Sequence, residues 1–467
     1  MVHKNQPIAI NLSDDIFQND KLERKNAIED LSSLLEATNQ SFVLALNADW
    51  GAGKTTFVKL WQAYLQKEKD MRSIYFSAWE DDFSKEPLIS ILGEIKKYID
   101  DNFSQKSDIS QSFEKVKSIG SKVLKRGVPA FVKGMTGGLL DVPKGVEEAI
   151  GAITESTAKE LIENYSKDKE ITKEFKKAIQ ELFSKIDEQK PFVVFIDELD
   201  RCRPLYAIEL LERIKHIFGI DGLIFVLSID KKQLTESIKS QYGNIDAQTY
   251  LRRFVDMEYN LQNVNLDDFC TYLYYDIYKL NDAFKTKEIK KEISSDLDDL
   301  AMLKYLAMSA NLSLRDVEQV FMRLKIIFYT IQPRLFDVHF RIIVLFVILK
   351  VRYSDKYELL LKKKIKEQEL IDVLVSKNIN YESIKELQTI MIKAIILSTA
   401  KSENEMNQVI DEQKSILSSI IDESELRMQS RLINVLELGY GNFRDYKLNR
   451  VIETVIKKVE FTDKFNF

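Results

Sequence analysis

The chain has few of the residues that build disulfide frameworks and most protein metal sites. Its 467 residues include two cysteines, Cys202 and Cys270, and three histidines, His3, His216 and His339. Two cysteines exclude a disulfide framework and a cysteine-rich zinc module, and they are typical of a reducing compartment. The spacing of the histidines matches no metal site. We therefore expect a cytoplasmic protein.

Long apolar runs and a dominant charge are also missing. The longest apolar run, residues 342–349, lies between Arg341 and Lys350 and is far shorter than the roughly 20 residues that span a bilayer, so it predicts a buried helix. Asp14 and Asp15 stand where an export signal would need an apolar core. The formal charge of −5 gives no general attraction for nucleic acid, which is not the default partner.

What the chain does have is a succession of short apolar runs separated by helical patterns. This alternation predicts an α/β fold with a parallel sheet that ends near residue 262. Pro87 and Pro204 are placed as first residues of helices, and Asp246 as a helix cap. The strand-like runs are Phe42–Leu46, Ile74–Ala78, Phe192–Ile196, Leu223–Ile229 and Met257–Leu261.

An insertion at about residues 100–185 separates the second and third strands. Seven of the 15 glycines lie between Gly120 and Gly151, in a stretch that several charged residues interrupt. Residues 120–153 therefore cannot cross a membrane as they stand. They form either a cover packed on the core or a surface that touches a partner or, peripherally, a membrane.

The remainder of the chain is almost wholly helical in its periodicity. We expect residues 1–262 to form the core, 264–330 a small helical lid, and 331–467 an all-α C-terminal domain without a catalytic pattern.

The segment after the first strand has the composition of a loop that grips phosphate groups. Gly51 and Gly53 let backbone N–H groups turn inward, Lys54 reaches the terminal phosphates, and the Thr55 hydroxyl is a ligand for Mg²⁺. The helix predicted from about Lys54 to Lys67 directs its positive dipole end at the same place. The residues expected to bind nucleotide are Asp49, Trp50, Gly51, Ala52, Gly53, Lys54, Thr55 and Thr56.

Position 48 departs from the G-x-x-x-x-G-K-[ST] pattern, because Ala48 stands where the pattern has glycine. A methyl group is tolerated there only if the residue does not need a positive φ.

Two acids follow the apolar run at 192–196, which predicts a buried strand. We expect Asp197 to hold Mg²⁺ through water and Glu198 to accept a proton from the attacking water. The next strand ends near Ser228 and Asp230, and either could sense the terminal phosphate. Asp230 is also well suited to cap the following helix.

The chain resembles the KAP family of P-loop NTPases, a branch of the additional-strand-catalytic-glutamate division. The resemblance covers roughly residues 5–330 and implies a sheet of strand order 5-1-4-3-2. Glu198 replaces a second Asp of the family pattern, and family members commonly carry transmembrane helices where this chain has its glycine-rich insertion. The matching segments are Trp50–Thr55, Ser77–Trp79 with Asp81, Asp82 and Pro87, Ile196–Pro204, and Asp20–Arg24.

Further site residues are implied by this resemblance. Arg315 resembles a lid arginine that swings onto the terminal phosphates, and Arg252, Arg253 or Arg201 could act as a finger that reaches a neighbouring subunit. Ordinary ion pairing is the alternative for these arginines. The segment with Leu22 and Arg24 is expected to contact the base or ribose, whereas Trp50, Trp61 and Trp79 are interpreted as core residues.

The resulting hypothesis is an ATP-binding and ATP-hydrolysing switch that uses Mg²⁺. Its expected partners are a protein effector or regulator and further copies of the chain, and the resemblance suggests a setting in bacterial antiphage defence or related signalling. The alternatives are a nucleotide-clamped scaffold with little hydrolysis and a kinase that transfers phosphate to an acceptor. DNA translocation is a weaker option.

Overall fold

The chain divides into two compact units, which we describe separately. In the computed structural model they comprise Pro7–Asn263 and Val264–Phe467, the latter joined by Met1–Gln6. The structure describes Leu12 and residues 15–18, 20–84, 86–126, 155–262, 266–280, 299–330, 337–375, 382–399, 401–437 and 448–465.

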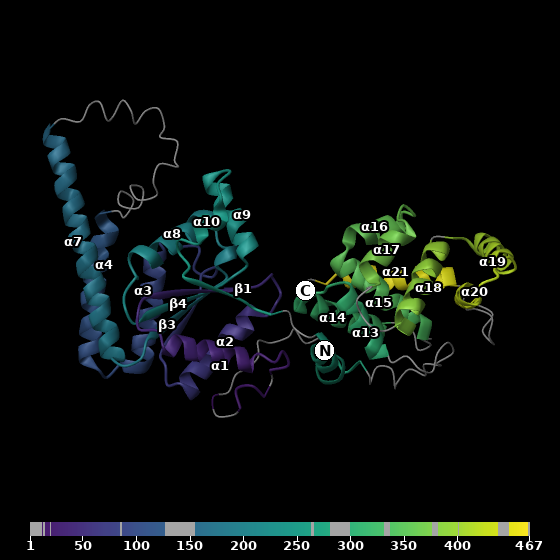
Figure 1. Cartoon of the computed structure of the whole chain (residues 1–467), viewed down its shortest axis with the longest axis horizontal. Coiled ribbons are helices and arrows are strands. Elements are labelled where there is room, and N and C mark those ends of the chain that lie inside the picture. Colours follow the sequence, from purple (N-terminus) through teal and green to yellow (C-terminus); the bar gives the residue numbers. More distant parts are fainter. Residues whose placement is uncertain are drawn as a thin grey trace. The chain divides into compact units, whose positions relative to one another are not determined.

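The first unit contains a sheet of five parallel strands in the order β2-β3-β4-β1-β5 (Figure 1). The predicted α/β class and strand order are thereby confirmed. β3 and β4 are buried along their whole length, as expected for parallel strands covered on both faces. The strands are β1 (Phe42–Asn47), β2 (Ser73–Ser77), β3 (Phe192–Asp197), β4 (Leu223–Ile229) and β5 (Met257–Asn260).

Helices cover both faces of this sheet (Figure 1). On one face, α1 (Lys25–Glu36) and α2 (Lys54–Glu68) bury Trp61 and Phe57 against the β3 residue Phe195. The opposite face is covered by α3 (Pro87–Phe103), α8 (Pro204–His216), α9 (Lys231–Tyr242) and α10 (Ala247–Leu251).

The starts of these helices agree with the sequence signals. Pro87 and Pro204 are the first residues of α3 and α8, where a missing N–H costs nothing. Asp230 accepts hydrogen bonds from the first turn of α9, and Asp246 accepts one from Thr249 N in α10. Local chemistry therefore specifies where each of these helices begins.

Two helices of the insertion, α4 (Ser107–Arg126) and α7 (Glu155–Ile186), lie side by side (Figure 1). Phe113 and Val116 of α4 and Phe175 and Ile179 of α7 belong to the core on the α3 side of the sheet. The glycine-rich centre, residues 127–154, lies outside the described residues, so the alternatives for 120–153 stay predictions there.

The second unit is helical throughout its described residues. In α15 (Asp337–Arg352) the apolar run 342–349 is buried, as predicted, and this helix packs against α14 (Leu314–Thr330) and α21 (Leu448–Thr462). Within the described residues, no helix is both long and apolar enough to span a membrane. The other helices are α11 (Leu266–Tyr272) with a π-helical turn (Leu273–Ile277), α13 (Asp299–Ser309), α16 (Ser354–Leu361), α17 (Glu367–Leu374), α18 (Glu382–Ser398), α19 (Glu403–Leu417) and α20 (Glu423–Leu436).

Candidate phosphate-binding site

The glycine loop connects β1 to α2 at the carboxyl edge of the sheet. Gly51 and Gly53 both have φ of 82°, a left-handed conformation that a side chain would strain. Ala48 does not have a positive φ, so its methyl group is compatible with the loop. Thr55 and Thr56 lie in the first turn of α2 and are half-buried. The loop therefore has the backbone form that its glycines predict.

The Lys54 ammonium folds back over this loop. Its Nζ donates hydrogen bonds to Ala48 O at 2.7 Å and to Asp49 O at 3.2 Å. Burial lowers the pKa of Lys54, and three carboxylates that favour the charged form oppose this effect. These carboxylates are Asp200, Asp230 and Asp197.

Asp230 links the glycine loop to the end of β4. Its Oδ1 accepts from Lys232 N at 3.1 Å and Gln233 N at 3.2 Å, as a helix cap does. Its Oδ2 accepts from Trp50 N at 3.2 Å, and the residue is only 4% exposed. The carboxylate thus connects the start of α9 to the loop. Because both oxygens of Asp230 already accept hydrogen bonds, Ser228 is the candidate sensor that is more available to a phosphate group.

Ser228 is fully buried in β4, and its Oγ has no hydrogen-bond partner among the described residues. In the sheet it lies beside Leu46 of β1 and Asp197 of β3. Buried hydroxyl groups normally have a partner. An orphaned hydroxyl next to the last β1 residues is therefore available to a polar ligand at this edge.

Asp197 is held at the end of β3 by two donors. Tyr75 OH donates to its Oδ2 at 3.1 Å, and Glu198 N donates to its Oδ1 at 3.0 Å. Burial, followed by the negative charge of Asp197, raises the pKa of Tyr75, so the phenol stays a donor. Asp197 is 1% exposed and consequently has a well-defined orientation.

Glu198 has a φ of 63°, a left-handed conformation that is uncommon for a residue with a side chain. Both of its carboxylate oxygens are engaged. Ser77 Oγ, at the end of β2, donates to Oε2 at 3.1 Å, and Arg201 Nη1 lies 2.6 Å from Oε1. The Arg201 guanidinium also lies 5.9 Å from the centre of the Trp79 ring.

The tryptophans differ from the prediction that all three pack in the core. Trp61 is fully buried, whereas Trp50 is 48% and Trp79 53% exposed. The Trp50 indole N–H donates to Asp200 Oδ2, and Asp200 Oδ1 is buried without a partner among the described residues. The prediction was wrong for two residues because each lies in a loop at the sheet edge, outside both helix layers.

The segment before α1 is anchored by backbone contacts. Asp20 accepts from Leu22 N at 3.2 Å and from Arg24 N at 2.6 Å. Arg24 Nη1 donates to Gln262 O at 3.0 Å, beyond the end of β5, and burial lowers the pKa of this guanidinium. Arg24 therefore fastens its segment to the sheet, and its contact with a base or ribose stays a prediction.

The remaining arginines lie on the surface of their own units. Arg252 and Arg253 are exposed in the turn after α10, and neither forms an ion pair within the part of the chain described. Arg315 is exposed in the first turn of α14, in the second unit. Asp49 is exposed and pairs with Lys232 at 3.0 Å.

Three residues of the site were assigned no role from the sequence: Tyr75 and Ser77, which contact the acids, and Asp200, which contacts Trp50. Tyr75 and Ser77 lie on β2, which pairs with β3 so that Ser77 is opposite Asp197. Once the strand order is known, the position of Tyr75 and Ser77 on the strand next to β3 predicts that they contact the acids. Asp200 has no such signal, because its contact with Trp50 depends on how the loop is folded.

These residues match the donors that Mg²⁺ and a triphosphate require. Backbone N–H groups, an ammonium and the N-terminus of α2 suit phosphate oxygens. The Thr55 hydroxyl and the Asp197 carboxylate are hard oxygen ligands. Two protein ligands are enough for Mg²⁺, because this ion keeps several of its water molecules and also binds phosphate oxygens. Within the described residues no group of three or more His, Cys, Asp or Glu side chains could hold a metal by itself.

Comparison with known proteins gives one family match. The family described as "KAP family P-loop domain" matches residues 24–440. No curated protein matches the chain. Similar solved structures include the Aeropyrum pernix ORC2 protein in ADPNP-ADP complexes (11% identity, TM-score 0.33, covering 99% of this chain and 98% of that one). Another is C. elegans PCH-2 (13% identity, TM-score 0.29, covering 73% and 70%).

Proposed function

The chain belongs to the KAP family of P-loop domains, and we propose that it binds ATP with Mg²⁺ and hydrolyses it. The observation that carries this proposal is the convergence of the glycine loop, Lys54, Asp197 and Glu198 at one edge of the sheet. The glycine loop follows β1 and the acids lie at the end of β3. β4 lies between these two strands, and all three end at nearly the same level, since Asn47 pairs with Ile229 and Asp197 with Ser228. Ligands of open parallel sheets bind at such carboxyl edges.

Binding rests on groups that the fold presents together. The backbone of Gly51 and Gly53 and the N-terminus of α2 surround the phosphates, and Lys54 exchanges its two carbonyl acceptors for phosphate oxygens. Thr55 and Asp197 would hold Mg²⁺, which would supply positive charge next to the phosphate oxygens. Ser228 supplies a further hydroxyl at the same edge.

Glu198 takes the proton of the attacking water in this proposal. In the structure its two oxygens contact Ser77 and Arg201, and an oxygen paired with a guanidinium is a poor proton acceptor. Hydrolysis therefore requires that Arg201 leave Glu198, whereas the Ser77 contact fixes the direction of the carboxylate. Ser77 is therefore a positioning residue for the base, whereas Arg201 holds the base in an inactive contact.

The biological role that we propose is a cytoplasmic, nucleotide-driven switch. The requirement to open the Glu198–Arg201 pair supports control of turnover by a partner or by further copies of the chain. The finger role of Arg252, Arg253 or Arg201 and the sensor role of Arg315 belong to this assembled state. Family resemblance alone supports a setting in antiphage defence with a separate effector.

Phosphate release from ATP tests the proposal, with Lys54→Ala and Glu198→Gln as the variants. We expect Lys54→Ala to lose ATP binding and Glu198→Gln to bind ATP·Mg²⁺ but to lose turnover by at least about 100-fold, as removal of a general base does. Lys67→Ala, at the far end of α2, is the matched control and should behave as wild type. If Glu198→Gln hydrolyses ATP at the wild-type rate, Glu198 is not the base.

A nucleotide-clamped scaffold with little hydrolysis is the second candidate, and the engaged state of Glu198 favours it. The two candidates differ in their response to ATP. If the protein is a scaffold, wild type and Glu198→Gln should have the same molar mass in solution when ATP·Mg²⁺ is present. If it is a switch, Glu198→Gln should stay in the ATP-bound state, whereas wild type should leave that state after it has hydrolysed ATP.

A further inference from the structure

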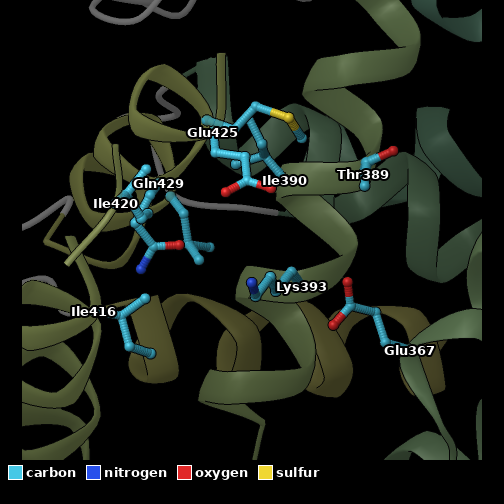
Figure 2. A pocket seen from close by; sticks show the side chains of 10 residues that line it. Glu367, Thr389, Ile390, Lys393, Ile416, Ile420, Glu425 and Gln429 are labelled. Carbon is cyan, nitrogen blue, oxygen red and sulfur yellow. The ribbon is translucent and has the colours of Figure 1, made fainter. Parts of the chain in front are cut away.

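The second unit contains a cavity far along the chain from the nucleotide residues. It has a volume of about 340 Å³ and lies among α17, α18, α19 and α20 (Figure 2). This volume is within the range of small-molecule sites, which begins at about 300 Å³. On α20 the lining residues recur at i, i+3, i+4 and i+7, so that one whole face of that helix borders the cavity: Glu425, Met428, Gln429 and Leu432.

Much of the cavity wall is apolar. The side chains that provide this surface come from three helices and the turn after α19. Ile416, near the end of α19, is 46% exposed, and Ile421, in the same turn, is 98% exposed. The turn at 416–421 is therefore a solvent-accessible side of the cavity. The apolar lining residues are Ile390, Ile416, Ile420, Met428 and Leu432.

Charged groups of both signs face the same space. Figure 2 shows Lys393 of α18 and Glu425 of α20 reaching into it, with Glu367 at one side. Lys393 is half-buried, yet neither it nor the two glutamates forms an ion pair within the described residues. Gln429 Nε2 donates to Gln413 O and Oε1, both at 3.0 Å, which leaves the Gln429 amide oxygen as an acceptor in the wall.

We propose that this cavity binds a small zwitterionic molecule with an apolar body. Its anionic group pairs with Lys393, its cationic or N–H donor group faces Glu425 and Glu367, and its apolar part covers the isoleucines. Lys393 forms no ion pair among the described residues, so an anionic group bound in the cavity would give it an opposite charge.

The charges that line the cavity distinguish a zwitterion from uncharged, anionic and cationic ligands. An uncharged apolar ligand would cover Lys393 without giving it a partner and would leave Glu425 unused. A plain anion would meet two carboxylates, and a plain cation would meet the ammonium. The zwitterion is the one class that gives each charged side chain an opposite charge.

Three probes that share one apolar body test the assignment on the full chain, without nucleotide. They are leucyl-leucine (zwitterion), leucyl-leucinamide (cation) and N-acetyl-leucyl-leucine (anion), with binding followed by calorimetry. We expect the zwitterion to bind with a dissociation constant at least 10-fold below those of the other two. Absence of leucyl-leucine binding, or equal binding of all three, overturns the proposal.

Variants show whether a bound probe occupies this cavity. Lys393→Met should weaken leucyl-leucine at least 10-fold, and Glu425→Gln should shift the preference toward the N-acetyl probe. Ile416→Trp, at the open side, should block binding, whereas Ile421→Trp, in the same turn but fully exposed, should not. Circular dichroism checks that each variant is folded. Probe binding that none of the cavity variants changes would place the site elsewhere and refute the proposal.

Lys54→Ala separates this result from the ATPase test. The proposed cavity and the glycine loop belong to different compact units. We therefore expect Lys54→Ala to bind leucyl-leucine as wild type does, whether or not the chain hydrolyses ATP.

Discussion

Replacement of Asp230 by alanine should affect both the stability of the first unit and its affinity for nucleotide. The carboxylate accepts three backbone hydrogen bonds, two from the first turn of α9 and one from Trp50 N in the glycine loop. Loss of a helix cap costs about 1 kcal/mol. Loss of a buried hydrogen bond to a charged group adds about 1.5–3 kcal/mol. Asp230→Ala should therefore destabilise the unit by about 3 kcal/mol.

Asp246→Ala is the matched control for this prediction. Asp246 caps α10 of the same unit through Thr249 N and also accepts from Thr249 Oγ1, but it is exposed and forms no hydrogen bond to the glycine loop within the described residues. We expect a smaller cost than for Asp230→Ala, because an exposed helix cap is lost and no bond to the loop. The comparison shows whether Asp230 contributes more than an exposed helix cap does, because both substitutions remove a cap.

Urea unfolding followed by tryptophan fluorescence measures the effect in the relevant unit. All three tryptophans, Trp50, Trp61 and Trp79, lie in the first unit, so the signal reports its unfolding and not that of the helical unit. With a slope of about 3 kcal/mol/M, the midpoint should fall by about 1 M for Asp230→Ala and by clearly less for Asp246→Ala.

Nucleotide affinity provides the second measurement. A loop that has lost its bond to Asp230 should bind ATP·Mg²⁺ about 10-fold more weakly, which corresponds to about 1.4 kcal/mol. Asp246→Ala should leave the affinity unchanged. Equal midpoint shifts for the two variants, or an unchanged affinity for Asp230→Ala, would refute the reasoning that Asp230 supports the loop.

Two further predictions follow from the contacts of Glu198 and Asp197, and a third from the burial of Glu212 in α8. Arg201→Ala frees one oxygen of Glu198 and should raise basal phosphate release several-fold in the isolated protein; a lower rate would instead assign Arg201 to transition-state binding. Tyr75→Phe removes a donor to Asp197 and should raise the Mg²⁺ concentration needed for half-maximal ATP binding about 10-fold, which a Mg²⁺ titration would measure. Burial raises the pKa of Glu212 to about 7, so this group favours the folded state when protonated, and the stability that it provides is lost as pH rises from about 4.5 to 7. Its replacement by glutamine should flatten the pH dependence of the urea midpoint across that window, and an unchanged pH profile would contradict the assignment.

The amino-acid sequence by itself determined the local features of this protein. Apolar runs located all five strands to within about a residue at each end, and Pro87, Pro204, Asp230 and Asp246 indicated where helices begin. The glycine loop and the acids at 197–198 were likewise visible. These signals are local because strand periodicity, helix caps and loop conformations depend on residues a few positions apart.

Only the tertiary structure decided which residues of distant segments meet. Tyr75 and Ser77 contact Asp197 and Glu198 from the neighbouring strand, more than 100 positions away in the chain. No local pattern encodes such a pair, since it depends on the order and register of the strands. The exposure of Trp50 and Trp79 was decided in the same way, because a large apolar side chain is buried only where another layer of the fold covers it.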